Sequence, residues 1–248
     1  MPETSESLPA VLPVPRPSLS RGRLAAEVFL CSGFPTQLII AAALASLGIV
    51  PLVDGALSPT FVFTNLLIDS IVMLALLWFF LRQSGDDPRT VFFGSGPIDR
   101  EIQLGLFSVP VVLTIVVAIQ LIVSLVAPSL HNVAQSPFDA FLGSRWMLAG
   151  FIAVLILAGG LREELQRAFL LHRFEQGLGG QAVGLLLTSI AFGLGHTMQG
   201  WDAAIATGTL GAFWGLLYMR RRSAAASIVS HAIFNVIQVV AGYAALTS

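Results

Sequence analysis

The residues of this chain that could do chemistry are polar side chains inside stretches that are otherwise almost pure hydrocarbon. Six side chains share this setting: Glu163, Glu164, Arg167, His196, His231 and Asn235. A charge at membrane depth costs several kcal/mol, so ionisable groups there mark function by default. Carboxylates and imidazoles can activate water, and imidazole and amide N–H groups can stabilise an oxyanion. The six residues therefore predict a hydrolytic site inside a membrane.

The two adjacent glutamates lie in the run Gly159-Gly160-Leu161-Arg162-Glu163-Glu164-Leu165-Gln166-Arg167. Glu163 and Arg167 are four residues apart, so on a helix they share a face and we expect them to form an ion pair. Glu164 is turned about 100° away. Carboxylates with different neighbours differ in proton affinity, which suits one as a base and the other as support. The alternative is a helix end whose charges are simply solvated.

The histidines lie in the two apolar stretches that complete the set. Two glycines, Gly193 and Gly195, come just before His196 in the sequence and would let another backbone approach closely. His231 and Asn235 are four residues apart and project from one helix face, where both could donate to an oxyanion. The alternatives are a packed, hydrogen-bonded histidine and a structural helix–helix contact.

The composition indicates a membrane protein. Of 248 residues, 55% are hydrophobic and 11% are charged, and the mean hydropathy is +0.83. Soluble domains carry about 25% charged residues. The net charge of −1 gives no reason to expect a nucleic-acid partner. The single cysteine, Cys31, excludes an intramolecular disulfide and is expected to be a small apolar residue.

Seven apolar stretches are long enough, at about 18–25 residues, to cross a bilayer as helices. They lie near 28–53, 62–82, 103–127, 146–170, 181–199, 203–219 and 224–246. If Pro35 divides the first stretch, an interfacial segment and a span from about Gln37 result, which adds an eighth element. We therefore predict an all-α polytopic bundle of about seven to eight transmembrane helices.

Two domains are expected: a disordered Pro/Ser-rich cytoplasmic tail at 1–24, and a transmembrane helical domain at 25–248. The arginines give the orientation. If the predicted spans cross the membrane in alternating directions, one side of the membrane carries Arg145. The other side carries Arg16, Arg21, Arg23, Arg82, Arg89, Arg100, Arg167, Arg173, Arg220, Arg221 and Arg222. The positive-inside rule then predicts a multi-pass protein of the cell membrane with its N-terminus in the cytoplasm.

Three motifs together resemble one known family. Glu-Glu-x-x-Arg begins at Glu163, Phe-x-x-x-His ends at His196, and His-x-x-x-Asn runs from His231 to Asn235. This order is similar to the CPBP family of intramembrane proteases (CAAX-processing and bacteriocin-protection, or Abi), and the resemblance covers about 145–240. The usual first motif is Glu-Glu-x-x-x-Arg, so this chain is one residue short. If the chain is aligned with the family motif on the two carboxylates, Glu163 takes the place of the leading glutamate. If it is aligned on the arginine, Glu163 takes the place of the second glutamate and Arg162 that of the first.

The resemblance implies a helical membrane endopeptidase that acts on a membrane-associated protein or peptide, with CAAX-type processing as one option. Glu163 and His196 would then activate water, and His231 and Asn235 would hold the oxyanion. Two histidines and a carboxylate (His196, His231 and Glu163) could also bind Zn²⁺ with an open fourth position, the other carboxylate serving as base. Both a metalloprotease and a glutamate-dependent protease remain open, and the oligomeric state is not predicted.

Two alternatives use the same polar groups: a proton-coupled transporter and a scaffold for another membrane protein. The peptidase interpretation also meets a geometric difficulty. In a simple zigzag of helices, Glu163 and His196 would lie ~10–15 Å apart in depth, at 1.5 Å rise per residue. They can meet only where helices tilt or break, and Gly159-Gly160 and Gly193/Gly195 are the expected weak points. Elsewhere, Asp69 is expected to be a structural acceptor and Asp202 a solvated loop residue.

Overall fold

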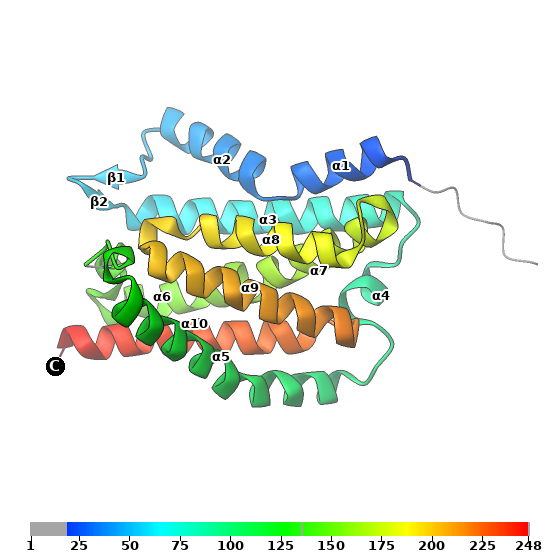
Figure 1. The fold of residues 1–248 in the computed structure, drawn as a ribbon. Helices are drawn as coiled ribbons and strands as arrows, with labels where there is room; N and C mark the ends of the chain where they lie inside the picture. Colours follow the sequence, from blue (N-terminus) through cyan, green and yellow to red (C-terminus); the bar gives the residue numbers. More distant parts are fainter. Residues whose placement is uncertain (1–18, 135, 248) are drawn as a thin grey trace, which may run out of the picture.

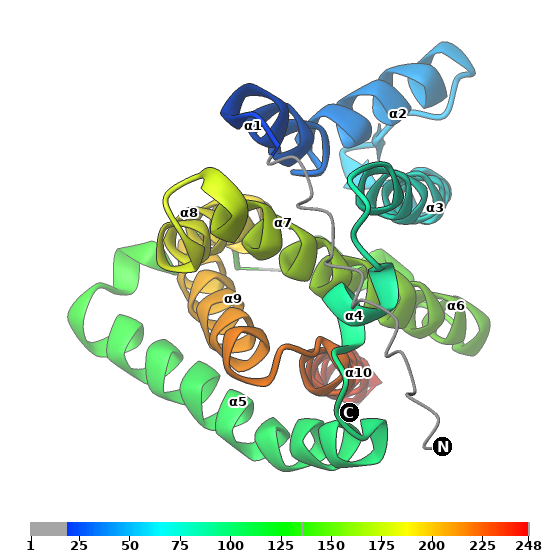
Figure 2. The ribbon, with the colours of Figure 1, turned by 90° about the vertical axis from the view of Figure 1, so that its right-hand side faces the viewer.

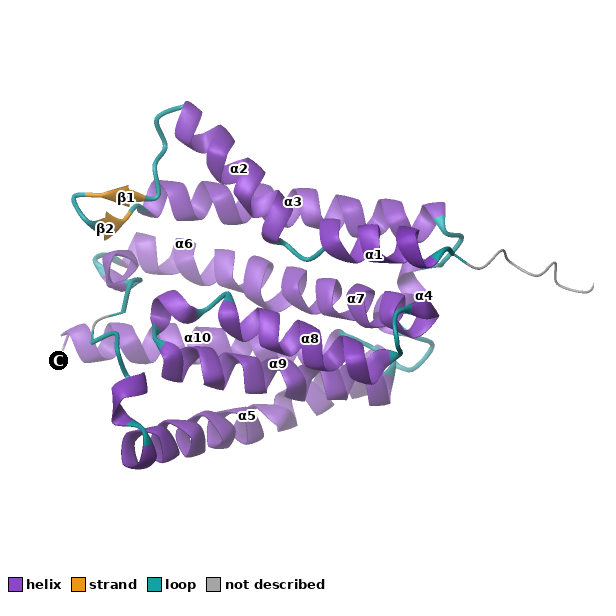
Figure 3. Cartoon of the chain, turned by 45° about the horizontal axis from the view of Figure 1, so that its top comes forward, coloured by secondary structure: helices purple, strands orange, loops and turns teal. Residues whose placement is uncertain are grey.

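The computed structural model describes residues 19–134 and 136–247, and these are helical almost throughout (Figures 1 and 3). The long helices are α1 (Arg21–Leu30), α2 (Phe34–Ser46), α3 (Pro59–Gln83), α5 (Ile98–Val126), α6 (Arg145–Leu155), α7 (Glu163–Gly177), α8 (Gln181–Leu194), α9 (Trp201–Arg221) and α10 (Ala225–Thr247). The short elements are α4 (Pro88–Phe93), η1 (Pro128–Leu130), η2 (Asp139–Leu142), η4 (Thr197–Gln199), the π-helical η3 (Ile156–Arg162), and a hairpin of β1 (Leu52–Val53) and β2 (Ala56–Leu57).

The predicted all-α membrane bundle is confirmed, but the predicted count of seven to eight spans is not. Four helical segments of the described chain are long and apolar enough to cross a membrane: 59–83, 88–126, 145–177 and 225–247. The pair α1 and α2 adds a fifth if it is one broken span. Each of the seven predicted stretches does contain a helix. However, α8 has only 14 residues, which is about 21 Å and short of a bilayer core.

The N-terminal stretch divides where Pro35 predicts a break. Gly33 has φ +92°, Pro35 lies in the first turn of α2, and the axes of α1 and α2 differ by 42°. Residues 1–18 of the predicted tail lie outside the described part of the chain. Residues 21–24 of that tail form the first turn of α1, because the Ser20 hydroxyl accepts a hydrogen bond from the Arg23 backbone and caps the helix.

Both predicted weak points are irregular in the structure. Gly159 and Gly160 lie in the π-helical η3, where the chain passes close to α10; a Cβ on Gly160 would lie 2.7 Å from Ala232 Cβ. The other break follows α8, which ends at Leu194 and turns through Gly195 into η4. A Cβ at Gly193 would lie 2.7 Å from the Ala204 carbonyl oxygen, so this glycine allows α9 to approach. These departures from regular helix lie directly before two of the predicted site residues, Glu163 and His196.

Most of the helices run roughly along one direction, with α5 inclined to them, so the bundle has two ends (Figures 1 and 2). The arginine-rich end, formed by the start of α1, the end of α3, α4 and the α9–α10 turn, carries nine described arginines: Arg21, Arg23, Arg82, Arg89, Arg100, Arg173, Arg220, Arg221 and Arg222. The arginine-poor end, with the hairpin and the α5–α6 connection, carries Arg145. Arg167 was assigned to the arginine-rich side from the sequence, but it is buried inside the bundle.

An apolar cluster fills the bundle next to the arginine-rich end, and we call it the end plug. Its buried members include Met73, Leu77, Leu81, Val91, Phe92, Leu165, Ala168, Phe169, Leu171, Tyr218 and Ala224. Helix α4 supplies Val91 and Phe92 and lies across this end, in front of the bundle in Figure 2. The Tyr218 hydroxyl donates to the Val91 carbonyl oxygen at 2.9 Å, so α9 is tied to α4.

Two buried arginines join the N-terminal helices to the rest of the bundle. Arg162 forms an ion pair with Asp69 of α3, which also accepts a hydrogen bond of 2.7 Å from Thr36 of α2. Asp69 is therefore a structural acceptor, as expected. Arg173 of α7 is fully buried and donates to Glu27 of α1 at 2.7 Å and to Asp86 of the α3–α4 loop at 2.7 Å.

Burial opposes ionisation of Asp86, but hydrogen bonds from His172, Arg173 and Ser84 outweigh it and lower the pKa of this carboxyl. The Arg173 guanidinium also donates to the Ser84 hydroxyl and to the Phe80 carbonyl oxygen, and it lies over the Phe169 ring. One side chain thus fixes α1, α3 and α7 relative to one another.

We predict that Arg173→Met destabilises the protein by about 3–5 kcal/mol, because it removes the buried cation that Glu27 and Asp86 share and leaves the buried Glu27 paired only with the partly exposed Arg23. Thermal unfolding in detergent measures the change. Arg100→Met is the matched control, since Arg100 is exposed at the same end, and it should change stability by less than about 0.5 kcal/mol. Equal Tm values for the two variants would contradict the structural role of Arg173.

Candidate active site

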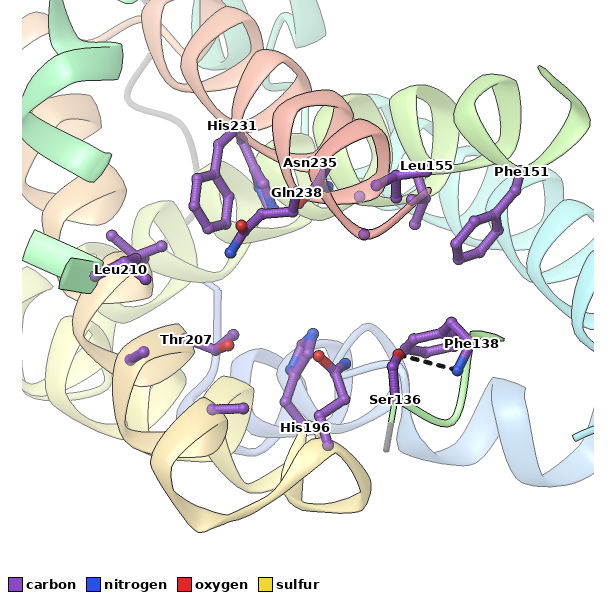
Figure 4. Close-up of a pocket in the computed structure, with 18 of the residues that line it drawn as sticks. Ser136, Phe138, Phe151, Leu155, His196, Thr207, Leu210, His231, Asn235 and Gln238 are labelled. Atoms are coloured by element: carbon purple, nitrogen blue, oxygen red, sulfur yellow. Dashed lines mark hydrogen bonds between the residues drawn. The ribbon is translucent and has the colours of Figure 1, made fainter. Parts of the chain in front are cut away.

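A cavity of about 480 Å³ lies between α3, α5, α6, α9 and α10 and receives four of the six predicted residues. Glu163, His196, His231 and Asn235 all line it. Figure 4 shows His231 and Asn235 on one wall and His196 on the opposite wall. The remaining two, Glu164 and Arg167, lie behind the wall that carries His231. The predicted convergence of the three motifs on one pocket is therefore seen in the structure.

Glu164 is buried and is shared between two partners. Its Oε1 accepts a hydrogen bond from the Arg167 guanidinium and lies 2.8 Å from His231 Nδ1. The predicted ion pair between Glu163 and Arg167 is wrong: Arg167 pairs with Glu164, three residues before it. The reason is the direction of Arg167, whose guanidinium lies over the Phe192 ring at 4.7 Å, on the side of α7 that packs against α8 and α9.

Glu163 differs from its neighbour because its carboxylate reaches the cavity. The Glu163 side chain is 20% exposed to solvent, whereas the Glu164 side chain is 1% exposed. Its Oε2 lies 3.9 Å from His231 Nε2, and its Oε1 lies 3.8 Å from the Arg162 guanidinium. The two carboxylates thus have different environments, one solvated and one fully paired, as the sequence predicted.

His231 is held rigidly at the inner end of the cavity. A carboxylate only accepts, so the contact with Glu164 places a proton on His231 Nδ1 and directs Nε2 toward Glu163. The Trp214 indole stacks on the imidazole with a centroid distance of 3.9 Å and an angle of 16°. Trp214 is itself fixed by a hydrogen bond of 3.2 Å from its Nε1 to the Ser230 hydroxyl.

Asn235 lies one turn after His231 on α10 and packs against the irregular helix η3. A Cβ at Gly159 would overlap the Asn235 amide nitrogen and would lie 4.0 Å from His231 Nε2. Only a glycine at position 159 leaves room for this amide beside the histidine. The close approach that Gly159 permits therefore places the amide group and the imidazole next to each other.

His196 faces this group from across the cavity (Figure 4). Its Nδ1 lies 2.7 Å from the Phe192 carbonyl oxygen, so Nδ1 donates and Nε2 keeps a free lone pair when the ring is neutral. The Phe192 ring contacts His196 edge-on at 4.8 Å and lies 6.1 Å from the His231 ring. The predicted pair Glu163–His196 thus shares one cavity but approaches it from opposite walls.

The predicted zinc set does not fit the structure. Among residues 19–134 and 136–247, no group of three His, Cys, Asp or Glu side chains is close enough to bind a metal ion. His196 lies across the cavity from His231, with its Nδ1 bonded to its own helix. His231 Nδ1 is likewise bonded to Glu164. These three side chains are therefore not arranged to hold Zn²⁺ together.

Some site residues were missed from the sequence. Trp214 supports His231 by stacking and Gln238 lines the cavity. Gln238 could have been found, because it lies three residues after Asn235 and seven after His231 and so falls on the same helix face. Trp214 comes from a different helix, and nothing in the sequence pairs it with His231.

Asp202 was expected to be a solvated loop residue, but it is only 4% exposed. It lies 2.7 Å from His131 Nδ1 at the arginine-poor end. Burial opposes its ionisation, but hydrogen bonds from His131 and from the Ala203 backbone outweigh this effect and lower the pKa of Asp202. The pair ties the start of α9 to the segment after α5.

The comparison with known proteins agrees with the geometry of the site. No curated protein and no solved structure matches the chain. Residues 144–237 match the family model described as type II CAAX prenyl endopeptidase Rce1-like, and this range contains all six predicted site residues. The resemblance to the CPBP intramembrane proteases is therefore confirmed over this part of the chain.

Proposed function

We propose that this protein is an intramembrane endopeptidase that hydrolyses a peptide bond of a membrane-associated substrate by direct attack of water. CAAX-type processing is the activity of the matched family. The observation that carries the proposal is the shared cavity of Glu163, His196, His231 and Asn235. Polar groups at membrane depth are tolerated where they line a hydrated cavity, and this cavity supplies the water that hydrolysis requires.

Glu163 is the general base in this proposal. It is the glutamate that reaches the cavity, whereas both hydrogen-bonding directions of the Glu164 Oε1 atom are occupied. The Glu163 carboxylate removes one proton from water while the hydroxide oxygen attacks the peptide carbonyl carbon. The same proton then passes to the leaving nitrogen as the C–N bond breaks. His196, whose Nε2 lone pair faces the cavity from the other wall, orients the water or the leaving amine.

Asn235 and His231 stabilise the oxyanion. The Asn235 amide nitrogen donates, and His231 Nε2 donates when the ring carries a second proton. Glu164 stabilises that cationic form because its carboxylate lies 2.8 Å from Nδ1. Glu164 and Arg167 are therefore positioning residues: they hold His231 and do not touch the substrate.

The end plug argues against a proton-coupled carrier. A carrier needs polar groups along a path across the whole membrane. The polar groups that line the cavity run from the middle of the bundle to the arginine-poor end. Toward the other end, the buried Arg173 is paired with Glu27 and Asp86 next to the apolar end plug, and no residue of α1 or α4 is among the described residues that line the cavity. A scaffold would not need His231 fixed both by the stacked Trp214 ring and by the Glu164 carboxylate.

We predict that Glu163→Gln lowers kcat by about 10²–10⁴-fold, the contribution of a general base. The assay uses purified protein in lipid nanodiscs with a farnesylated CAAX peptide and with host membrane proteins, and mass spectrometry detects new termini. Glu175→Gln is the matched control, because this exposed glutamate lies on the same helix and pairs with Arg222. Wild-type turnover by Glu163→Gln would remove Glu163 from the mechanism.

We predict that Glu164→Gln loses both stability and activity, because it leaves the buried Arg167 charge unpaired, at a cost of about 3–5 kcal/mol. The double variant Glu164→Gln/Arg167→Met removes that charge, so it should regain stability in a thermal scan. It should not regain activity, since His231 still lacks its carboxylate. Recovery of activity together with stability would show that Glu164 has only a structural role.

We predict that Asn235→Ala lowers kcat by about 10²–10³-fold with little change in KM, the loss measured for a single oxyanion donor. Steady-state kinetics on the same peptide separates the two constants. Gln103→Ala, which truncates an exposed amide on α5, is the control and should match the wild type. A rise in KM at constant kcat would instead make Asn235 a substrate-binding residue.

A further inference from the structure

The cavity extends toward one end of the bundle. From Glu163 and His231 in the middle of the bundle it extends to the arginine-poor end, where its walls include Ser136 and Asp139 of the α5–α6 connection and Gly242 near the end of α10. Polar side chains of three elements line this part of the cavity: Gln120 of α5, Gln199 of η4 and Gln238 of α10. In Figure 4, Gln238 lies on the His231 wall, and Ser136 and Phe138 lie on the wall of His196.

The described lining of this cavity stops short of the arginine-rich end. None of the described lining residues belongs to α1, α4 or α8. On that side of His231, the end plug is packed from α3, α4, α7 and α9, and Trp214 covers the imidazole face. The fully buried Arg173 holds the same end together. Water and peptide therefore have an open path from one end of the bundle.

The arginines identify the two ends. Nine described arginines lie at the plugged end, whereas Arg145 lies at the end to which the cavity extends. Clusters of positive charge next to membrane spans remain in the cytoplasm. The positive-inside rule thus predicts that the plugged end is cytoplasmic and that the cavity faces away from the cytoplasm.

We propose that the substrate enters the active site from the extracytoplasmic side, as a segment that leaves the membrane at the arginine-poor end. This inference rests on the proposed peptidase function and specifies its substrate class. The lining includes two carboxylates, Asp139 and Glu163, and no arginine, so it suits an uncharged or basic segment. A prenylated C-terminus anchored at the cytoplasmic surface would have to pass the end plug.

Cysteine accessibility tests the direction without requiring activity. In a Cys31→Ser background, which removes the one native thiol, three single cysteines are compared. Gln238→Cys reports the cavity, Ala56→Cys reports the exposed hairpin at the arginine-poor end, and Gln83→Cys reports the exposed end of α3 at the arginine-rich end. Each is treated with a membrane-impermeant maleimide in sealed right-side-out and inside-out vesicles.

We expect Gln238→Cys and Ala56→Cys to be labelled in right-side-out vesicles and to lose labelling in inside-out vesicles, with Gln83→Cys showing the reverse. Labelling of Gln238→Cys together with Gln83→Cys would overturn the inference, as would labelling from neither face. Reversal of the two control positions would overturn the orientation on which it depends.

Cleavage assays separate this inference from the proposed function. Two single-span model proteins are reconstituted with the enzyme, one carrying a flexible uncharged segment just outside the extracytoplasmic membrane surface and the other the same segment at the cytoplasmic surface. The inference predicts cleavage of the first. Cleavage of the second alone would refute the direction and keep the peptidase, whereas cleavage of neither, with correct labelling, would count against the peptidase alone.

Discussion

The site depends on one buried carboxylate, that of Glu164, which is shared between a guanidinium and an imidazole. A single carboxylate inside the bundle would be costly to bury, but the Arg167 charge and the His231 N–H group satisfy it. This arrangement fixes the tautomer of His231 and aims its second nitrogen at Glu163. One glutamate of the pair is used to position the histidine, which leaves the other free to face water.

Glycines at two irregular points of the helices allow the site residues to line one cavity. Regular helices would hold Glu163 and His196 at different depths. The π-helical η3 and the turn after α8 change the path of the chain where Gly159, Gly160 and Gly193 allow close backbone approach. The same irregularity lets Asn235 pack beside His231. Local departure from α-helix is thus the structural feature that combines three sequence motifs into one cavity.

The sequence predicted which residues meet but not how they pair. The motifs around Glu163, His196 and His231 stand out because polar groups are rare in apolar helices, and that contrast is visible without a structure. The partner of Arg167 depends on the rotation of α7 against α8 and α9, which residue spacing alone cannot supply. The stacking of Trp214 on His231 depends in the same way on tertiary packing. The count of seven to eight spans is not confirmed, because neither α8 nor α9 is among the helices that are both long and apolar enough to cross the bilayer.

The proposed mechanism depends on direct attack of the peptide carbonyl by water that Glu163 holds. Mass spectrometry of a reaction run in oxygen-18-labelled water and quenched during turnover distinguishes this step from attack by an enzyme side chain. Direct attack predicts one labelled oxygen in the new carboxyl group of the product and an enzyme of unchanged mass throughout. An enzyme carrying an acyl fragment of the substrate, or the absence of any labelled product, would contradict it.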